Sequence, residues 1–174
     1  MTTTPAFSAI RHLVARQALL RIHPVLWKTL LDELAARGEG WRESGAFLLT
    51  PKDGDRRRVS EIVYFDNLDP NALRGGIRLR SIAFSRLWRR CRDRRLGVVA
   101  DVHTHPGTWI GQSAIDKSNP MIARPGHYAI IIPELARGSR DPRDAGFHIY
   151  RGDAGWEEYF HAAAAWRLYV WRWA

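Results

Sequence analysis

The residues best suited to chemistry lie between positions 103 and 116. His103 and His105 follow residues 97–100, an apolar and β-branched stretch that predicts a buried strand. Alternate side chains of a strand share a face, so both imidazoles would lie on one side of the strand end. Asp116 follows Ser113 by about one helical turn, which would bring both side chains to the same place. Two imidazole nitrogens and one carboxylate oxygen form a catalytic zinc set with the fourth tetrahedral position left for water.

The residues between the histidines and the aspartate predict a turn and then a short helix. Pro106 ends the strand, and the loop that follows contains Gly107 and Gly111. Ser113 is a typical helix N-cap. A pair of histidines in the pattern His-X-His is weak evidence alone, since two polar residues at a strand end are common. Asp101 shares the strand parity of the histidines, so spacing alone does not exclude it as a ligand.

This stretch resembles the JAMM motif of the JAB/MPN metalloprotease family, which reads His-Ser/Thr-His-Pro, a short spacer and Ser-X-X-Asp. The matching residues are His103, Thr104, His105, Pro106, Ser113 and Asp116, and seven residues separate His105 from Ser113 as in the family pattern. The family also carries an upstream glutamate, followed by small residues and an apolar strand. Glu43 to Leu49 fits that place, with Ala46 where the family often has glycine.

The resemblance implies a fold and a set of roles. It covers residues 20–160 and implies an α/β, cytidine-deaminase-like layered fold with helices on both sides of a mixed sheet. It implies one Zn²⁺ per chain held by His103, His105 and Asp116, with Asp101 in a supporting or structural role. It gives Glu43 the role of general base and Ser113 that of a hydrogen-bond donor to the oxyanion of the reaction intermediate.

The resemblance also implies a reaction and partners. The motif and its flanking loops are similar to those of stand-alone bacterial JAMM proteins, encoded beside ubiquitin-like, E1-like and E2-like proteins in antiphage operons. We therefore expect an isopeptidase that cleaves the amide bond after the C-terminal tail of a ubiquitin-like protein, in precursors or conjugates. Alternatives are a JAMM peptidase for sulfur-carrier proteins, a nucleic-acid-associated relative and a non-catalytic MPN scaffold. A scaffold usually loses motif residues, and this chain keeps them.

Composition bounds the class of protein. The 174 residues, 45% of them hydrophobic, suit one domain over 1–174 with a core at about 20–160. The single cysteine, Cys91, excludes an intrachain disulfide, a cysteine-based zinc knuckle and the Cys-X-X-Cys site of zinc deaminases. The sequence contains no His-Glu-X-X-His zincin motif. No signal peptide or membrane span is expected, and a cytoplasmic location is compatible with the cysteine content.

The net charge of +9 indicates an acidic partner, nucleic acid or an anionic surface. The densest basic run is 86–95, and it carries an apolar stripe of Phe84, Leu87, Trp88 and Cys91 at helical spacing. We interpret the run as one solvated helix face and keep nucleic-acid binding as the alternative. The remaining histidines lack partners at ligand spacing and are interpreted as surface or hydrogen-bonded core residues: His12, His23, His127, His148 and His161.

The pattern along the chain predicts alternating helices and strands. Helices are expected from Pro24 to Gly38, with Leu26, Leu30, Leu31 and Leu34 buried and Trp27 flanking them, and over 81–95. Strands are expected at 9–14, 43–49, 57–65, 77–80, 97–103, 127–133, 146–150 and 156–160, with loops at 67–76 and 134–144. The aromatic tail, residues 162–174, is expected to begin as helix and to pack across its own domain; contact with a second copy or a partner is the alternative.

Overall fold

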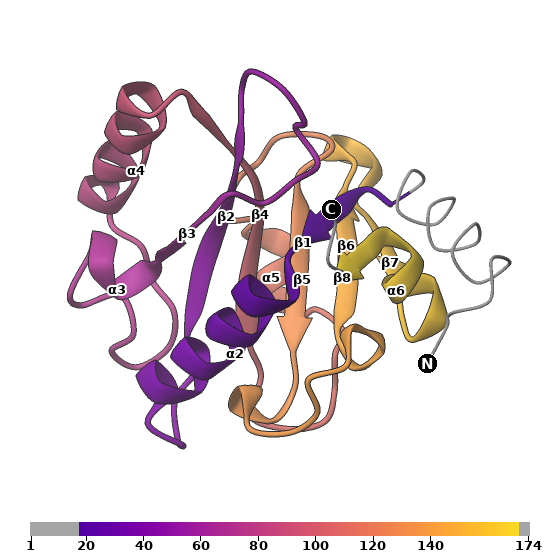
Figure 1. The fold of residues 1–174 in the computed structure, drawn as a ribbon. Coiled ribbons are helices and arrows are strands. Elements are labelled where there is room, and N and C mark those ends of the chain that lie inside the picture. Colours follow the sequence, from indigo (N-terminus) through magenta and orange to yellow (C-terminus); the bar gives the residue numbers. More distant parts are fainter. Residues whose placement is uncertain (1–17, 171–174) are drawn as a thin grey trace, which may run out of the picture.

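The computed structural model describes residues 18–170, which form a six-stranded mixed sheet and a two-stranded sheet with helices around them (Figure 1). The strands are β1 (Leu20–Ile22), β2 (Gly45–Pro51), β3 (Glu61–Tyr64), β4 (Leu96–Thr104), β5 (Tyr128–Ile132), β6 (Gly146–Tyr150), β7 (Trp156–Tyr159) and β8 (Leu168–Val170). The helices are α2 (Pro24–Gly38), α3 (Phe65–Leu68), α4 (Ser81–Asp93), α5 (Ala114–Ser118) and α6 (Ala162–Arg167), with 3₁₀ turns η1 (Glu134–Ala136), η2 (Pro142–Asp144) and η3 (Gly152–Ala154).

Strand β4 lies in the middle of the large sheet, whose order is β3-β2-β4-β5-β6-β7. It pairs antiparallel with β2 and parallel with β5, while the other pairs of this sheet are antiparallel. The register shifts between Leu48 and Leu49, which lie opposite Ala100 and Val98, so Val99 is an extra residue on β4. This bulge changes which side chains face which side, because strand side chains otherwise alternate strictly.

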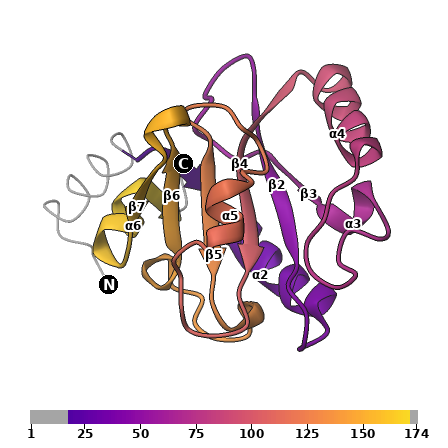
Figure 2. The same ribbon diagram turned by 180° about the vertical axis from the view of Figure 1, so that it is seen from behind.

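Two hydrophobic clusters cover opposite faces of the large sheet. One joins α2, β1, β8 and α6 to the face that carries Leu48, Ala100 and Val102. The other joins α3 and α4 to the face that carries Phe47 and Val98. Helix α2 lies in front of the sheet in Figure 1, and α5 lies in front of it in the reverse view of Figure 2. The expected mixed sheet with helices on both faces is therefore confirmed.

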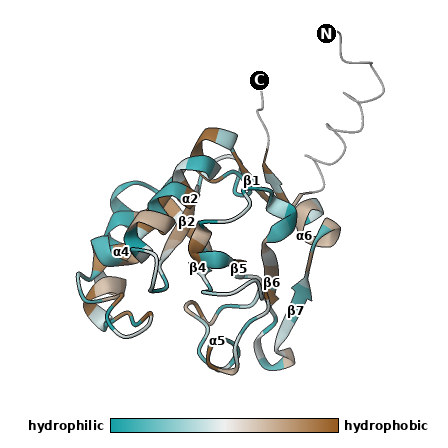
Figure 3. Ribbon diagram, turned by 90° about the horizontal axis from the view of Figure 1, so that it is seen from below, coloured by the Kyte–Doolittle hydropathy of each residue, from teal (hydrophilic) through white to brown (hydrophobic). Residues whose placement is uncertain are grey.

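The edge strand β7 differs from the strands inside the sheet. Figure 3 shows β7 as hydrophilic, while β6 beside it carries the buried apolar residues Phe147 and Ile149. Glu157 and Glu158 supply the charge, and charged edge strands discourage pairing with a further strand. Within residues 18–170, no helix combines the length and apolar character needed to cross a membrane.

Several expected elements are present with small shifts of their ends. Helix α2 matches its prediction, although Trp27 is buried more deeply than Leu26 and donates its indole N–H to Arg140 O at 2.8 Å. Helix α4 buries Leu87 and Cys91 as expected, while Trp88 stays 39% exposed, contrary to its place in the predicted stripe. The strand predicted at residues 9–14 lies outside the described residues.

Two strand predictions were wrong. The strand predicted at 57–65 has different ends, and the strand predicted at 77–80 does not form. Residues 57–60 are not part of β3; Arg57 and Val59 instead exchange backbone hydrogen bonds with Arg21, in β1. Phe65, the last residue of the predicted strand, begins α3. Residues 77–80 form no strand because no neighbouring strand pairs with them, and Arg80 instead binds the buried carboxylate of Asp69 through two nitrogens.

The tail packs across its own domain as far as residue 170. Helix α6 buries Ala164, and β8 pairs in parallel with β1 so that Leu168 lies opposite Leu20. The hydrophobic core therefore extends past the predicted limit of about residue 160. Residues 171–174 lie outside the described part.

Candidate metal centre

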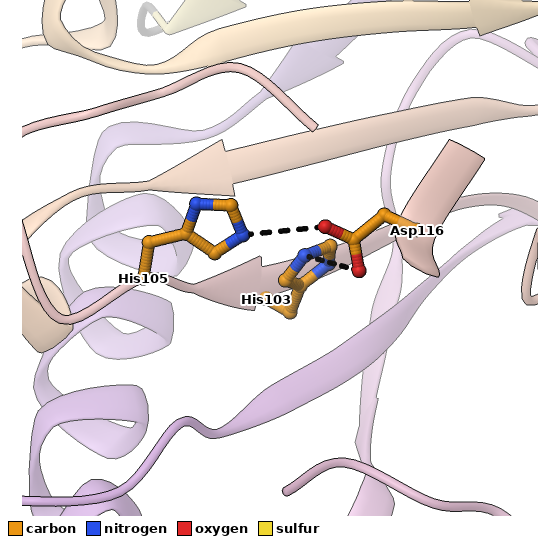
Figure 4. Close-up of side chains that lie close together, drawn as sticks. All are labelled: His103, His105 and Asp116. Atoms are coloured by element: carbon orange, nitrogen blue, oxygen red, sulfur yellow. Dashed lines mark ion pairs between the residues drawn. The ribbon is translucent and has the colours of Figure 1, made fainter. Parts of the chain in front are cut away.

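Three side chains converge at the carboxyl end of β4 (Figure 4). Their ligand atoms, one from each of His103, His105 and Asp116, lie within 4.8 Å of one another. His103 and His105 are buried and Asp116 is half-buried. The bulge at Val99 contributes to this arrangement, because it turns Ala100 and Val102 toward α2 and leaves Asp101 and His103 on the opposite face.

The distances within the cluster suit a shared metal ion better than direct pairing. His103 Nε2 lies 3.7 Å from Asp116 Oδ1, and His105 Nε2 lies 3.5 Å from Asp116 Oδ2. Both separations exceed the roughly 2.7–3.2 Å of a good N–H···O hydrogen bond. Ligand atoms about 2.0–2.1 Å from a tetrahedral zinc ion are about 3.3 Å apart. The observed spacing is close to that value.

The ring nitrogens show which atoms are left to bind a metal. Both nitrogens of His103 are buried without a hydrogen-bond partner. Such groups are costly unless something binds them. His105 Nδ1 lies 3.3 Å from Trp109 O, and a carbonyl only accepts, so Nδ1 carries the hydrogen. Its Nε2, which faces Asp116, is then left with a free lone pair. The donor set therefore fits a divalent ion such as zinc.

The charge of Asp116 favours a cation at the cluster, whereas His103 must lose its ring proton before it can ligate one. Burial lowers the pKa of His103, but Asp101 and Asp116 outweigh this effect and raise that pKa to about 9. Burial likewise raises the pKa of Asp116, while His103 and His105 outweigh it and hold that pKa well below its usual range. The Asp116 carboxylate is therefore ionised at neutral pH, and its negative charge attracts a cation to the site.

Asp101 lies behind the cluster and connects His103 to a second histidine. Its Oδ1 accepts a hydrogen bond from His127 Nε2 at 2.7 Å, and its Oδ2 lies 3.7 Å from His103 Nδ1. Asp101 and His127 are both buried. Burial raises the pKa of Asp101, but the two histidine rings outweigh it and lower that pKa. Asp101 thus has the position of a carboxylate that orients a ligating histidine, whereas the sequence offered no partner for His127.

Glu43 reaches the centre through the pairing of β2 with β4. Gly45 lies opposite His103, and this antiparallel register continues beyond the strand through hydrogen bonds between Ser44 and Thr104. Ser44 N donates to Thr104 Oγ1 at 2.9 Å, so the residue between the two histidines holds the segment that carries Glu43. Continued by one step, the register sets Glu43 across from His105. No side chain among residues 18–170 forms a hydrogen bond or ion pair with the Glu43 carboxylate.

Ser113 and Asp116 are fixed by the first turn of α5. Ser113 Oγ accepts from Asp116 N at 3.1 Å, and Asp116 Oδ2 accepts from Ser113 N at 2.8 Å, which together form a capping box. The expected N-cap is therefore confirmed. Helix α5 is held in turn by β7, where Trp156 Nε1 donates to Lys117 O at 3.1 Å and Glu158 pairs with Lys117.

The loop between His105 and Ser113 is anchored to β6. His148 Nε2 donates to Ile110 O at 3.0 Å, and burial lowers the pKa of His148. Gly146 lies beneath the same loop, where a side chain would collide with Ile110 O and with His148 Nε2. Trp109, 59% exposed, stacks on His105 with ring centroids 5.6 Å apart. These contacts require the folded register of β6, so sequence spacing did not indicate them.

Four of the five predicted site residues line one cavity of about 250 Å³: Glu43, His105, Ser113 and Asp116, together with Pro106, Gly107 and Trp109. His103 contributes instead to a smaller hollow of about 20 Å³ on the other side of Asp116, beside Asp101 and Gln112. The structure therefore brings all five residues to one place. A substrate entering the larger cavity would meet Glu43 and Ser113 beside two of the three candidate ligands.

Comparisons with known proteins bear on the fold. No protein-family model matches the chain. A solution structure of protein DSY2949 from Desulfitobacterium hafniense is 19% identical, covers 89% of this chain and 94% of that chain, and has a TM-score of 0.58. A solution structure of a protein from Salinibacter ruber is 18% identical over 79% and 87%, with a TM-score of 0.55. The crystal structure of AF2198, a JAB1/MPN domain protein from Archaeoglobus fulgidus, is 21% identical over 86% and 96%, with a TM-score of 0.47. The first two likenesses show a shared fold.

Proposed function

We propose that this chain is a JAMM-type zinc metallopeptidase that hydrolyses the amide bond after the C-terminal tail of a ubiquitin-like protein. The observation that carries the proposal is the cavity shared by Glu43, Ser113 and the ligand pair His105 and Asp116. A metal cluster alone would suit a structural site, which usually has four protein ligands. Three ligands next to a half-buried glutamate suit hydrolysis.

The chemistry divides between the ion and the chain. A zinc ion held by His103, His105 and Asp116 would lower the pKa of a bound water molecule to about 7 and would polarise the substrate carbonyl. The Glu43 carboxylate accepts the proton that the attacking water loses, and it then delivers that proton to the amine nitrogen of the leaving group. Its lack of a competing partner within residues 18–170 leaves both oxygens available for this transfer.

Ser113 has the geometry of a hydrogen-bond donor. Its Oγ already accepts the backbone N–H of Asp116, and a hydroxyl can accept and donate at the same time. The hydroxyl hydrogen is therefore free to point into the cavity toward the oxyanion that forms as water attacks the carbonyl. No imidazole or carboxylate is bonded to Ser113 Oγ within the described residues, so it lacks the base that a nucleophile needs.

The substrate class is supported by the motif resemblance. The histidines, Ser113, Asp116 and the upstream Glu43 match a family that often cleaves after the glycine-terminated tail of ubiquitin or its relatives. E1-like and E2-like proteins of the same pathway are the partners that this substrate implies, and a cytoplasmic location is part of the same proposal. The exposed Trp109 at the cavity offers an apolar surface for an extended tail.

Cleavage of a ubiquitin-like fusion protein by the Glu43→Gln variant tests the proposal. The amide keeps the size of the side chain but cannot take a proton, so we expect about a 10²–10⁴-fold loss of kcat with zinc content unchanged. Glu33→Gln, which removes one carboxylate from the outer face of α2, is the matched control and should cleave normally. Full activity of Glu43→Gln would reject Glu43 as the base. Failure of the wild type to cleave any tail fusion while holding zinc would reject the substrate class.

A further inference from the structure

A basic groove lies at the end of β4 opposite the metal centre. It occupies about 650 Å³ between the β2–β3 connection, the end of α4 and the start of β4. The β2–β3 connection lies near the top of Figure 1. Five cationic side chains and a single carboxylate, Asp53, line it: Lys52, Arg56, Arg92, Arg95 and Arg124. The groove therefore holds a formal charge of +4 (five positive, one negative), out of +9 for the whole chain.

Two of the four arginines of this groove, Arg124 and Arg56, are held by backbone carbonyls of the groove itself. Arg124 Nη2 donates to Val98 O at 3.0 Å, and Arg56 Nε donates to Lys52 O at 3.0 Å. Each guanidinium keeps further N–H groups for a ligand, because arginine has five donors. Arg95 pairs with Asp53 at 2.6 Å. Lys52 and Arg92 have no side-chain partner among residues 18–170, so the positive charges in the groove are mostly unneutralised.

We propose that this groove binds a compact polyphosphate group, either free or carried by a nucleotide. Guanidinium groups pair with phosphate oxygens through two parallel hydrogen bonds, and several phosphates in a row match several converging cations. The volume lies within the range of small-molecule sites. No aromatic side chain is among the described residues that line the groove, so a base has nothing to stack on and the phosphates are what is recognised.

This site is separate from the proposed peptidase centre. His103 is five positions along β4 from Val98, which lines the groove, and no candidate metal ligand is shared. The groove also gives the basic end of α4 a role that a solvated helix face does not require. The ligand class follows from charge and shape alone, and it does not depend on peptidase activity.

Calorimetric titration of the purified full-length chain with inorganic tripolyphosphate at low salt tests the proposal. We expect one binding site and an affinity that falls as salt rises, since salt screens exposed charges. The variant Lys52→Glu/Arg92→Glu should bind at least about tenfold more weakly, because each lost charge-assisted hydrogen bond costs about that factor. The matched control Arg78→Glu/Arg89→Glu changes net charge equally, on exposed arginines outside the groove, and should bind as the wild type does.

Further titrations and a second groove variant identify the source of the phosphates and exclude other binding sites. Tighter binding of ATP than of tripolyphosphate would indicate a nucleotide ligand, equal binding would show that the phosphates are recognised with or without a nucleoside, and binding of tripolyphosphate alone would indicate free polyphosphate. Arg56→Gln serves as a second groove variant if thermal unfolding shows that the first is destabilised. If Arg78→Glu/Arg89→Glu weakened tripolyphosphate binding as much as the groove variant does, net charge alone would explain the effect and the proposal would be overturned. It would also be overturned by no binding of either ligand, by binding lost on chelation of metal, or by binding of an oligonucleotide alone.

Discussion

At the scale of single residues, the surroundings of His103 are the strongest indication of a metal site. Both ring nitrogens are buried without a hydrogen bond, yet carboxylates lie 3.7 Å away on each side. Asp116 is placed to share an ion with His103. Asp101 is placed to orient the ring, because it is itself fixed by His127 at 2.7 Å.

The Asp101→Asn variant tests this orienting role. An amide presents one oxygen where the carboxylate presents two, so its N–H₂ group faces either the His127 or the His103 ring nitrogen. Removing such a supporting partner typically lowers metal affinity about 10–100-fold, and we expect a loss of that size here. Competition with a chromophoric chelator measures it. Asp93→Asn, at the exposed end of α4, is the control. Equal zinc affinity of Asp101→Asn and wild type would contradict the role.

Zinc affinity should also depend on pH through His103. In the metal-free site the pKa of His103 is about 9, so below that pH the ring must lose a proton before it can ligate. Affinity should therefore fall as pH falls, by up to about tenfold per pH unit, and should level off above pH 9. Asp116 adds nothing to this slope, since its lowered pKa keeps it ionised. Chelator competition at three pH values between 6.5 and 8.5 measures the slope. A flat profile would show that His103 is not a ligand.

At the scale of elements, the site depends on how closely β2 approaches its neighbours. Gly45 packs where a Cβ atom would lie 2.7 Å from Val102 O and would overlap the Phe65 ring. Only glycine therefore allows β2 to pair with β4 in the register that brings Glu43 across from His105.

Gly45→Ala should disturb both the sheet and the site. Overpacking of this kind costs about 1–3 kcal/mol of the free energy of unfolding, and the shift of β2 should also lower peptidase activity. Gly97→Ala is the matched control on β4, because a Cβ atom there meets nothing within 4 Å. Urea unfolding of both variants measures the difference. If the two variants unfold alike, the close approach of β2 is not what fixes this register.

How far the elements could be predicted depends on whether their signal is local. Helix α2 and the capping box at Ser113 carry their signals within a few residues, and both were predicted correctly. Residues 57–60 directly precede the apolar residues of β3, but Arg57 and Val59 form backbone hydrogen bonds with Arg21 of β1, a partner far away in the sequence. The motif residues from His103 to Asp116 are likewise local. The Asp101–His127 and His148–Ile110 contacts depend on sheet register, so no sequence pattern indicated them.

At the scale of the whole molecule, the two ends of the described chain pack on each other. Strand β1 pairs with β8, and Leu20 and Leu168 are buried between this small sheet and the main core. The aromatic tail therefore serves its own domain, up to residue 170. Within the described part of the tail, Trp166 is 50% exposed.

The Leu168→Ala variant measures how much the packing of β8 against β1 and the core contributes to the free energy of unfolding. Leu168 is 1% exposed, and truncation of a buried leucine costs about 2–5 kcal/mol. Trp166→Ala removes a larger side chain from the neighbouring helix α6 and should cost far less, because half of that ring is already in water. Thermal or urea unfolding compares the two. A larger loss for Trp166→Ala, together with a change in molecular mass in solution, would favour a contact with a second copy.

The most direct test of the account is the metal content of the purified protein, measured by mass spectrometry beside the variant His103→Ala/His105→Ala. We expect about one zinc ion per wild-type chain and none retained by the variant, because two of three ligands are gone. A wild-type protein that holds no metal as purified and binds none on reconstitution would contradict it.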